Sequence, residues 1–108
     1  MRIDYEKLTK DLIRAKEASV EAAKGEDGGS ANLDSLTIRI PRARESKVIE
    51  AVKNAGLYTR GRREWIGSRY FISAPTGGQG NSNYRAVQAM DKVMSEAGWD
   101  TLVFYKMD

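Results

Sequence analysis

The chain has 108 residues, enough for one domain with a hydrophobic core, and its composition (41% hydrophobic, 31% charged) is typical of a globular protein. It contains no cysteine and no histidine, which excludes disulfides, metal sites built from these residues, and Ser-His or Cys-His catalysis. We therefore expect no enzyme, no cofactor and no metal. Without a membrane-length apolar run or a signal-peptide pattern, the sequence predicts a cytoplasmic protein with no membrane contact.

The net charge of +3 is distributed unevenly along the chain. Residues 39–69 hold nine basic and three acidic side chains, a net charge of +6, whereas the segments on either side are slightly negative. Such a local field attracts phosphate backbones or an acidic protein surface. A solvated surface that only keeps the protein soluble is an equally good interpretation.

The first predicted element is a helix over residues 4–24. Apolar side chains recur there at spacings of three and four, and helix-favouring residues fill the other positions. A glycine-rich segment follows and ends the helix. We therefore expect an N-terminal helix in residues 1–24, a linker in residues 25–35 and the main domain in residues 36–108.

The first half of this domain predicts a strand followed by a helix. Residues 36–40 alternate between apolar and polar, as in a half-buried strand, and Pro41 ends them. A helix is expected over residues 45–55. Gly56 then suits a left-handed helix cap, and Leu57 can pack back against the helix.

The second half repeats this order of strand, proline, loop, helix, glycine cap and strand. The expected elements are strands over 58–66 and 69–74, a loop over 76–81, a helix over 82–97 and a last strand over 101–107. A two-residue hairpin, Gly67-Ser68, would join the two middle strands, and Asn81 or Ser82 would cap the helix. Two such units predict an α+β fold of the ferredoxin-like split βαβ type: a four-stranded antiparallel sheet with two helices on one face, preceded by the N-terminal helix.

This fold leaves one face of the sheet open. Thr37 and Arg39 should point there from the first strand. From the third strand we expect one of two sets, either Arg69, Phe71 and Ser73 or Tyr70, Ile72 and Ala74. The last strand is apolar on both faces, so part of the open face should be covered. The N-terminal helix is the first candidate for this cover, and a partner protein or a second copy is the next.

Basic and aromatic residues interleave on the predicted strands. Stacking combined with phosphate contact is how sheets hold single-stranded RNA or DNA. The candidate contacts for a partner or a nucleic acid are Arg39, Arg60, Arg62, Arg63, Trp65, Arg69 and Phe71. The glycine–aromatic spacing of RNA-recognition domains is missing, and a salt-bridged surface with Trp65 and Tyr70 in the core is the alternative.

The glycine-rich loop before the last helix is a second candidate contact. Its backbone N–H groups could hold an anion or touch a partner, and its residues are Gly77, Gly78, Gln79, Gly80 and Asn81. A P-loop lysine and the Rossmann spacing are both absent, so a plain connecting loop is the alternative. Glu26, Asp27 and Asp34 cluster in sequence, but we expect neither catalysis nor metal binding from them.

Several segments resemble a group of small proteins from phages and mobile elements of Gram-positive bacteria. They are residues 26–29 (EDGG) with Asn32 and Asp34, residues 78–81 (GQGN) and residues 105–108 (YKMD), and the resemblance covers about residues 25–108. It implies a counter-defence role in the bacterial host cell, such as that of an anti-CRISPR protein. It assigns no role to any residue.

Three functional hypotheses follow. The first is a non-enzymatic inhibitor that binds a bacterial defence complex, above all a CRISPR-Cas effector, with anchors such as Trp65 and Tyr58. The second is a small regulator that binds RNA or DNA through the basic and aromatic strands. The third is a structural phage protein that forms a homodimer through its open sheet face.

Overall fold

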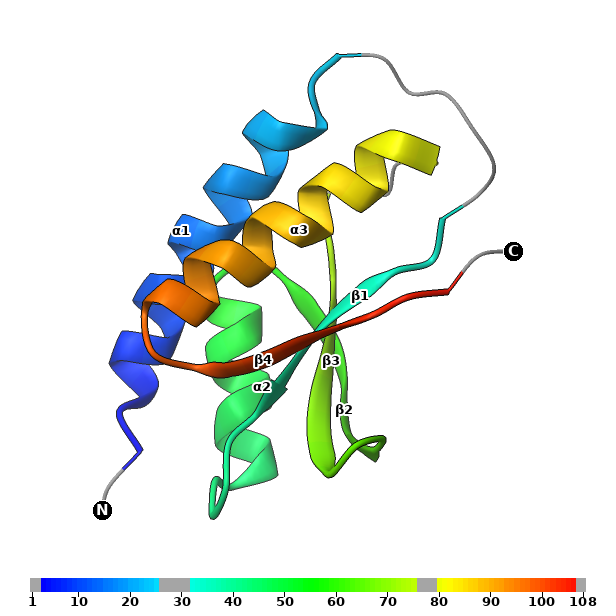
Figure 1. The fold of residues 1–108 in the computed structure, drawn as a ribbon. Helices are drawn as coiled ribbons and strands as arrows, with labels where there is room; N and C mark the ends of the chain where they lie inside the picture. The colour runs from blue at the N-terminus through cyan, green and yellow to red at the C-terminus, as the bar shows by residue number, and fades with distance from the viewer. Residues whose placement is uncertain (1–2, 26–31, 76–79, 107–108) are drawn as a thin grey trace.

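The computed structural model describes residues 3–25, 32–75 and 80–106 (Figure 1). Its elements are α1 (Tyr5–Ala23), β1 (Ser35–Arg39), α2 (Glu45–Asn54), β2 (Tyr58–Glu64), β3 (Ser68–Ser73), α3 (Gly80–Glu96) and β4 (Asp100–Phe104). The predicted α+β class and order of elements are confirmed. None of the helices in these segments has the length and apolar character needed to cross a membrane.

The four strands form one antiparallel sheet in the order β2-β3-β1-β4. β1 and β2 therefore run parallel with β3 between them, and α2 connects them. β3 and β4 likewise run parallel on either side of β1, and α3 connects them. This interleaving of two β-α-β units is the ferredoxin-like arrangement.

The two predicted glycine caps are also confirmed. Gly56 and Gly98 adopt φ values of 79° and 100°, in the left-handed region that glycine favours. Leu57 and Trp99, the residues after them, each donate a backbone hydrogen bond to the carbonyl five residues earlier, at 3.0 and 3.1 Å. These bonds end α2 and α3 in the same way and turn the chain into the following strand.

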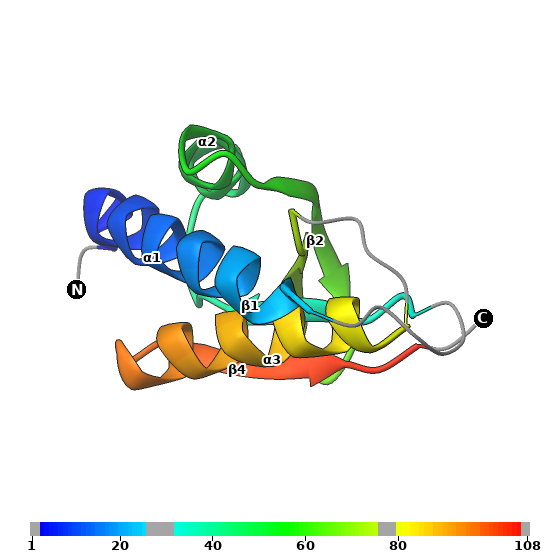
Figure 2. The ribbon, with the colours of Figure 1, turned by 90° about the horizontal axis from the view of Figure 1, so that it is seen from above.

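The helix α1 lies on the helix side of the sheet and packs against both α2 and α3 (Figure 2). Its Leu8, Leu12 and Ala15 are fully buried in the same core as Leu36 and Ile38 of β1. The expectation that this helix covers the open face is therefore wrong. The buried apolar side chains of the sheet point toward the helices. The apolar stripe of α1 packs against these side chains and not against the open face.

The hairpin between β2 and β3 differs from the prediction. β2 ends at Glu64 and β3 begins at Ser68, so the turn has three residues instead of the two predicted. Ile66 and Gly67 both have positive φ, at 48° and 88°. The side chain of Arg69 donates a hydrogen bond from Nε to the Ile66 carbonyl at 2.9 Å and so stabilises this turn.

The start of α3 and the end of β4 also differ from the prediction. The helix α3 begins at Gly80, so Asn81 and Ser82 lie in its first turn and neither is its N-cap. β4 ends at Phe104, because the next inward-facing backbone N–H, that of Lys106, donates to the Asp34 carboxylate at 2.9 Å instead of continuing the ladder.

Candidate functional site

A β-bulge in β2 decides which arginines reach the open face of the sheet. Two residues of this strand, Arg60 and Gly61, lie opposite the single residue Phe71 of β3. Gly61 has a φ of 107°, which suits glycine and few other residues. The extra residue reverses the side-chain alternation in the part of β2 that follows.

Arg60 and Arg63 consequently line a groove on the open face, whereas Arg62 lies opposite Tyr70, whose buried side chain belongs to the helix side. The Arg62 backbone N–H donates to Glu45 Oε2 of α2 at 3.0 Å. Burial raises the pKa of Tyr70, and the charge of Arg62 opposes this shift. Arg62 therefore does not share a surface with Arg63, contrary to the sequence-based grouping.

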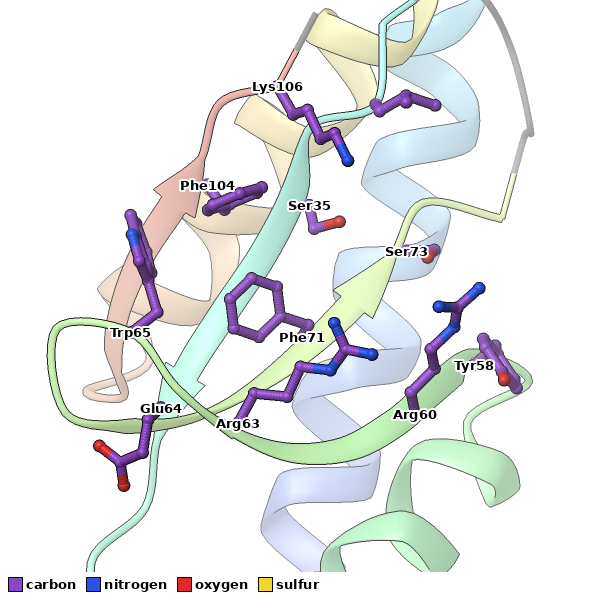
Figure 3. A pocket seen from close by; sticks show the side chains of 11 residues that line it. Ser35, Tyr58, Arg60, Arg63, Glu64, Trp65, Phe71, Ser73, Phe104 and Lys106 are labelled. Carbon is purple, nitrogen blue, oxygen red and sulfur yellow. The ribbon is translucent and has the colours of Figure 1, made fainter. Parts of the chain in front are cut away.

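The groove has a volume of about 450 Å³ and crosses the open face from β2 to β4 (Figure 3). Three rings from different elements meet in it: Trp65 from the hairpin, Phe71 from β3 and Phe104 from β4. They contact one another edge to face, with centroid separations of 5.9 Å (Trp65–Phe71), 5.0 Å (Trp65–Phe104) and 5.3 Å (Phe71–Phe104). Trp65 thus provides, from within the chain, part of the cover that the sequence predicted for the open face.

The rings are half-buried, so each keeps part of its surface accessible. The accessible parts of the three rings give the groove an apolar surface that a planar group can contact. Ser35 and Ser73 add hydroxyl groups along the same groove.

Three exposed cations surround the ring cluster, namely Arg60, Arg63 and Lys106. Within the described segments, none of the three forms an ion pair. The acidic residue that lines the groove, Glu64, accepts a hydrogen bond from the Ser68 hydroxyl and points away from the rings (Figure 3). The groove is therefore positively charged, and none of the acidic side chains that the structure describes neutralises its cations.

Arg39 and Arg69 lie outside the groove and pair with the same carboxylate, that of Asp100 in β4, at 3.9 and 3.5 Å. Arg69 is only 4% exposed. Its hydrogen bond to Ile66 and its ion pair with Asp100 join the hairpin to β4 across the sheet. These contacts make Arg69 a structural residue, so it leaves the predicted contact set.

The predicted loop contacts are mostly not described by the structure. Gly77, Gly78 and Gln79 lie outside the described residues, as do Glu26 and Asp27. Gly80 is buried and Asn81 exposed at the start of α3, and neither lines the groove.

Asp34 is buried and has a structural role. Its Oδ1 accepts the Lys106 N–H, while Asn32 Oδ1 accepts bonds from the Asp34 N–H at 2.9 Å and from Asn83 Nδ2 at 2.7 Å. This network joins the start of β1, the chain after β4 and the start of α3. In the three described segments, no group of acidic side chains could hold a metal ion.

Among the rings and cations of the groove, the predicted contact set lacks Phe104 and Lys106. The alternation of the last strand places them on one face, which was a usable signal. It could not indicate their neighbours, because only the position of β4 beside β1 brings Phe104 to 5.3 Å from Phe71.

Comparison of the chain with protein-family models, with curated proteins and with solved structures gives no match. The function of the groove is therefore inferred from its geometry and charge.

Proposed function

We propose that the protein binds single-stranded nucleic acid in the groove on its open sheet face. The phosphates contact Arg60, Arg63 and Lys106, and the bases stack on the rings of Phe71 and Phe104. The observation that carries this proposal concerns residues 3–25, 32–75 and 80–106: three cations without an ion pair there surround a half-buried three-ring cluster, on a sheet face that α1, α2 and α3 leave open.

A single strand fits this surface better than a duplex. In a duplex the ring faces of the bases are stacked on one another, so only the backbone would be available to the protein. A single strand can turn its bases onto an aromatic floor and still present its phosphates to flanking cations. The bases then contact the apolar part of the groove, and the phosphates contact its charged part.

The experiment that tests this proposal is fluorescence anisotropy with labelled single-stranded RNA, single-stranded DNA and duplex DNA. We expect tight binding of a single strand and weaker binding of the duplex, with affinity falling steeply between about 50 and 200 mM salt. Absence of binding at the lower salt, or a preference for duplex, would overturn the proposal.

Adjacent arginines provide a matched pair of variants. Arg63→Ala removes a groove cation and should weaken binding, whereas Arg62→Ala removes the same charge from the other side of the sheet and should leave affinity nearly unchanged. Phe71→Ala should weaken binding by about 1–3 kcal/mol through lost stacking. Thermal melts of each variant check that the fold is retained, and equal effects of the two arginine variants would contradict the assigned groove.

A second candidate function is inhibition of a bacterial defence complex such as a CRISPR-Cas effector. Tyr58 at the groove and Ile66 at the hairpin tip are 62% and 64% exposed, and such side chains can anchor a protein contact beside a bound strand. An effector presents both protein and single-stranded nucleic acid. Target cleavage in the presence of the wild type and of Ile66→Asp tests this candidate, and unimpaired cleavage with the wild type would reject it.

A further inference from the structure

The two edge strands of the sheet differ in how well they are protected against pairing with another strand. The edge strand β2 is protected by its bulge and its three arginines, and its Arg62 N–H is already bonded to Glu45. The other edge strand, β4, has no charged side chain between Asp100 and Lys106. Leu102 in this strand and Tyr105, directly after it, are exposed, at 38% and 61%.

The backbone bonds of β4 show which of its groups face outward. Lys106 uses its N–H and its carbonyl toward β1, with Asp34 Oδ1 at 2.9 Å and the Leu33 N–H at 2.8 Å. The Leu102 carbonyl also faces β1, where it accepts the Thr37 hydroxyl at 2.7 Å. The backbone N–H and C=O groups of successive residues point to opposite sides of an extended chain. Those of Thr101, Val103 and Tyr105 therefore point to the open edge. Among the described residues no side chain or loop bonds to these groups.

We propose that β4 pairs antiparallel with β4 of a second copy of this chain, in a register centred on Val103. In this register the outward-facing residues oppose one another, Val103 with its own copy and Thr101 with the partner's Tyr105. Asp100 then lies opposite the partner's Lys106, and Leu102 lies opposite the partner's Phe104. In this register the outward backbone groups of the two strands form hydrogen bonds with each other. Opposite charges face each other at Asp100 and Lys106, and apolar side chains face each other at Leu102 and Phe104.

The neighbouring registers lack this match. A shift by two residues in one direction places Asp100 opposite the partner's Phe104, and a shift in the other direction places Leu102 opposite the partner's Lys106. Opposing residues of an antiparallel pair share a sheet face, so the two open faces lie on the same side of the joined sheet. The ring cluster at Phe104 then continues onto the partner's Leu102, and the two grooves become neighbours. Lys106 belongs to both the groove and this interface, so the dimer is tested on protein free of nucleic acid.

Light scattering over a concentration series tests the dimer. We expect the wild type to reach twice the monomer mass. Lys106→Glu turns two attractive charge pairs into repulsive ones and should weaken dimerisation by about tenfold, while Lys92→Glu, an exposed position on α3, should not. A wild type that stays monomeric at every concentration, or a dimer that Lys106→Glu leaves unchanged, would overturn the proposal.

A proline variant separates the edge contact from the fold. Thr101→Pro removes an N–H that faces the open edge and no bond to β1, so the dimer should be lost while thermal melting stays cooperative. Thr101→Ala keeps the N–H and should dimerise. If both variants dimerise alike, the edge is not the interface.

The register can be tested by cross-linking, because the natural chain has no cysteine. Asp100→Cys and Lys106→Cys proteins, mixed under mild oxidation, should form a mixed disulfide, since this opposing pair has the close Cα spacing that a disulfide requires. Either protein alone should form none, because the two copies of one position lie far apart along the strands. Disulfides in the single proteins without the mixed product would refute the register.

Discussion

The carboxylate of Asp11 shows how a single residue attaches α1 to the rest of the fold. It is 7% exposed and accepts hydrogen bonds from Lys7 Nζ at 2.7 Å, Trp99 Nε1 at 2.9 Å and Arg14 Nη1 at 3.2 Å. Burial opposes its ionisation. The hydrogen bonds from Lys7 and Trp99, together with the charges of Lys7 and Arg14, outweigh burial and hold the pKa of Asp11 below its ordinary value.

This pKa shift predicts how stability depends on pH. A carboxyl whose pKa is lower in the folded state contributes stability above its unfolded pKa, and the contribution is lost as the pH falls through the folded value. We expect Asp11→Asn to lower the unfolding free energy by about 1–2 kcal/mol at neutral pH. The difference from the wild type should shrink below about pH 4.

Urea unfolding at neutral and acid pH measures this effect. Glu17→Gln, an exposed position on the same helix, is the control and should change stability little at either pH. A difference between Asp11→Asn and the wild type that stays constant over this range would contradict the role assigned to the charge.

Gly61 determines which face the neighbouring arginines occupy. A Cβ on this residue would lie 2.6 Å from Glu45 Oε2, the atom that accepts the Arg62 N–H, and its φ of 107° is unfavourable for other residues. We predict that Gly61→Ala lowers the unfolding free energy by about 1–3 kcal/mol.

Gly98→Ala is a matched control for this variant, because Gly98 has a similar φ of 100° and no atom within 4 Å of its Cβ position. Chemical denaturation of both variants separates backbone strain from the contact with Glu45. We expect the larger loss at Gly61, and equal losses would show that the contact with Glu45 is unimportant.

At the scale of elements, α1 is an integral part of the core. The sequence predicts a linker between this helix and the main domain within one globular unit, and Leu8 and Leu12 are fully buried with the strands. We predict that Leu12→Ala lowers the unfolding free energy by about 2–5 kcal/mol. Its neighbour Ile13 is 41% exposed, so Ile13→Ala should cost less than about 1 kcal/mol.

Equilibrium unfolding by urea checks this pair of variants. A single cooperative transition for both is expected, because α1 shares one core with the sheet. Similar small losses at Leu12 and Ile13 would mean that α1 is a peripheral helix after all.

The hairpin is the element that builds the groove. Its turn is fixed by the Arg69 bond to Ile66, and its Trp65 reaches the ring of Phe104 on the far edge strand. Trp65 is itself one of the three turn residues, 65–67, so its position depends on this turn. The ring cluster therefore depends on the local conformation of the turn as well as on the strand order.

At the scale of the whole molecule, the basic middle of the chain divides into separate surfaces. Arg60 and Arg63 meet Lys106 from the far end of the chain in the groove, whereas Arg62 turns to the helix side and Arg39 and Arg69 pair with Asp100. The charge available to a ligand is thus smaller than the +6 of this segment and more localised.

This division predicts the salt dependence of binding. For single strands, the slope of log affinity against log salt falls by about 0.7 for each phosphate contact removed. Arg60→Gln, Arg63→Gln and Lys106→Gln should each reduce the slope by about this amount, and Arg62→Gln should not. Anisotropy titrations at several salt concentrations provide the slopes. An equal reduction for Arg62→Gln would place the bound strand elsewhere.

The sequence alone predicted the type, the order and the approximate limits of the elements, because these depend on local signals. Alternation identified β1, the 3–4 periodicity identified the helices, and Ala-Gly pairs identified both helix caps. The repeated order of the elements then favoured the ferredoxin-like topology. Aromatic and basic residues on strands also pointed to the open face.

The tertiary structure decided which side chains share a surface. A bulge at Gly61, which lies against Glu45 of α2, exchanges the faces of Arg62 and Arg63, and no local periodicity indicates it. The position of α1 was decided by the larger apolar layer on the helix side of the sheet. Phe104 and Lys106 joined the groove because β4 lies beside β1. Such long-range proximity follows from strand order and packing, which local sequence patterns do not encode.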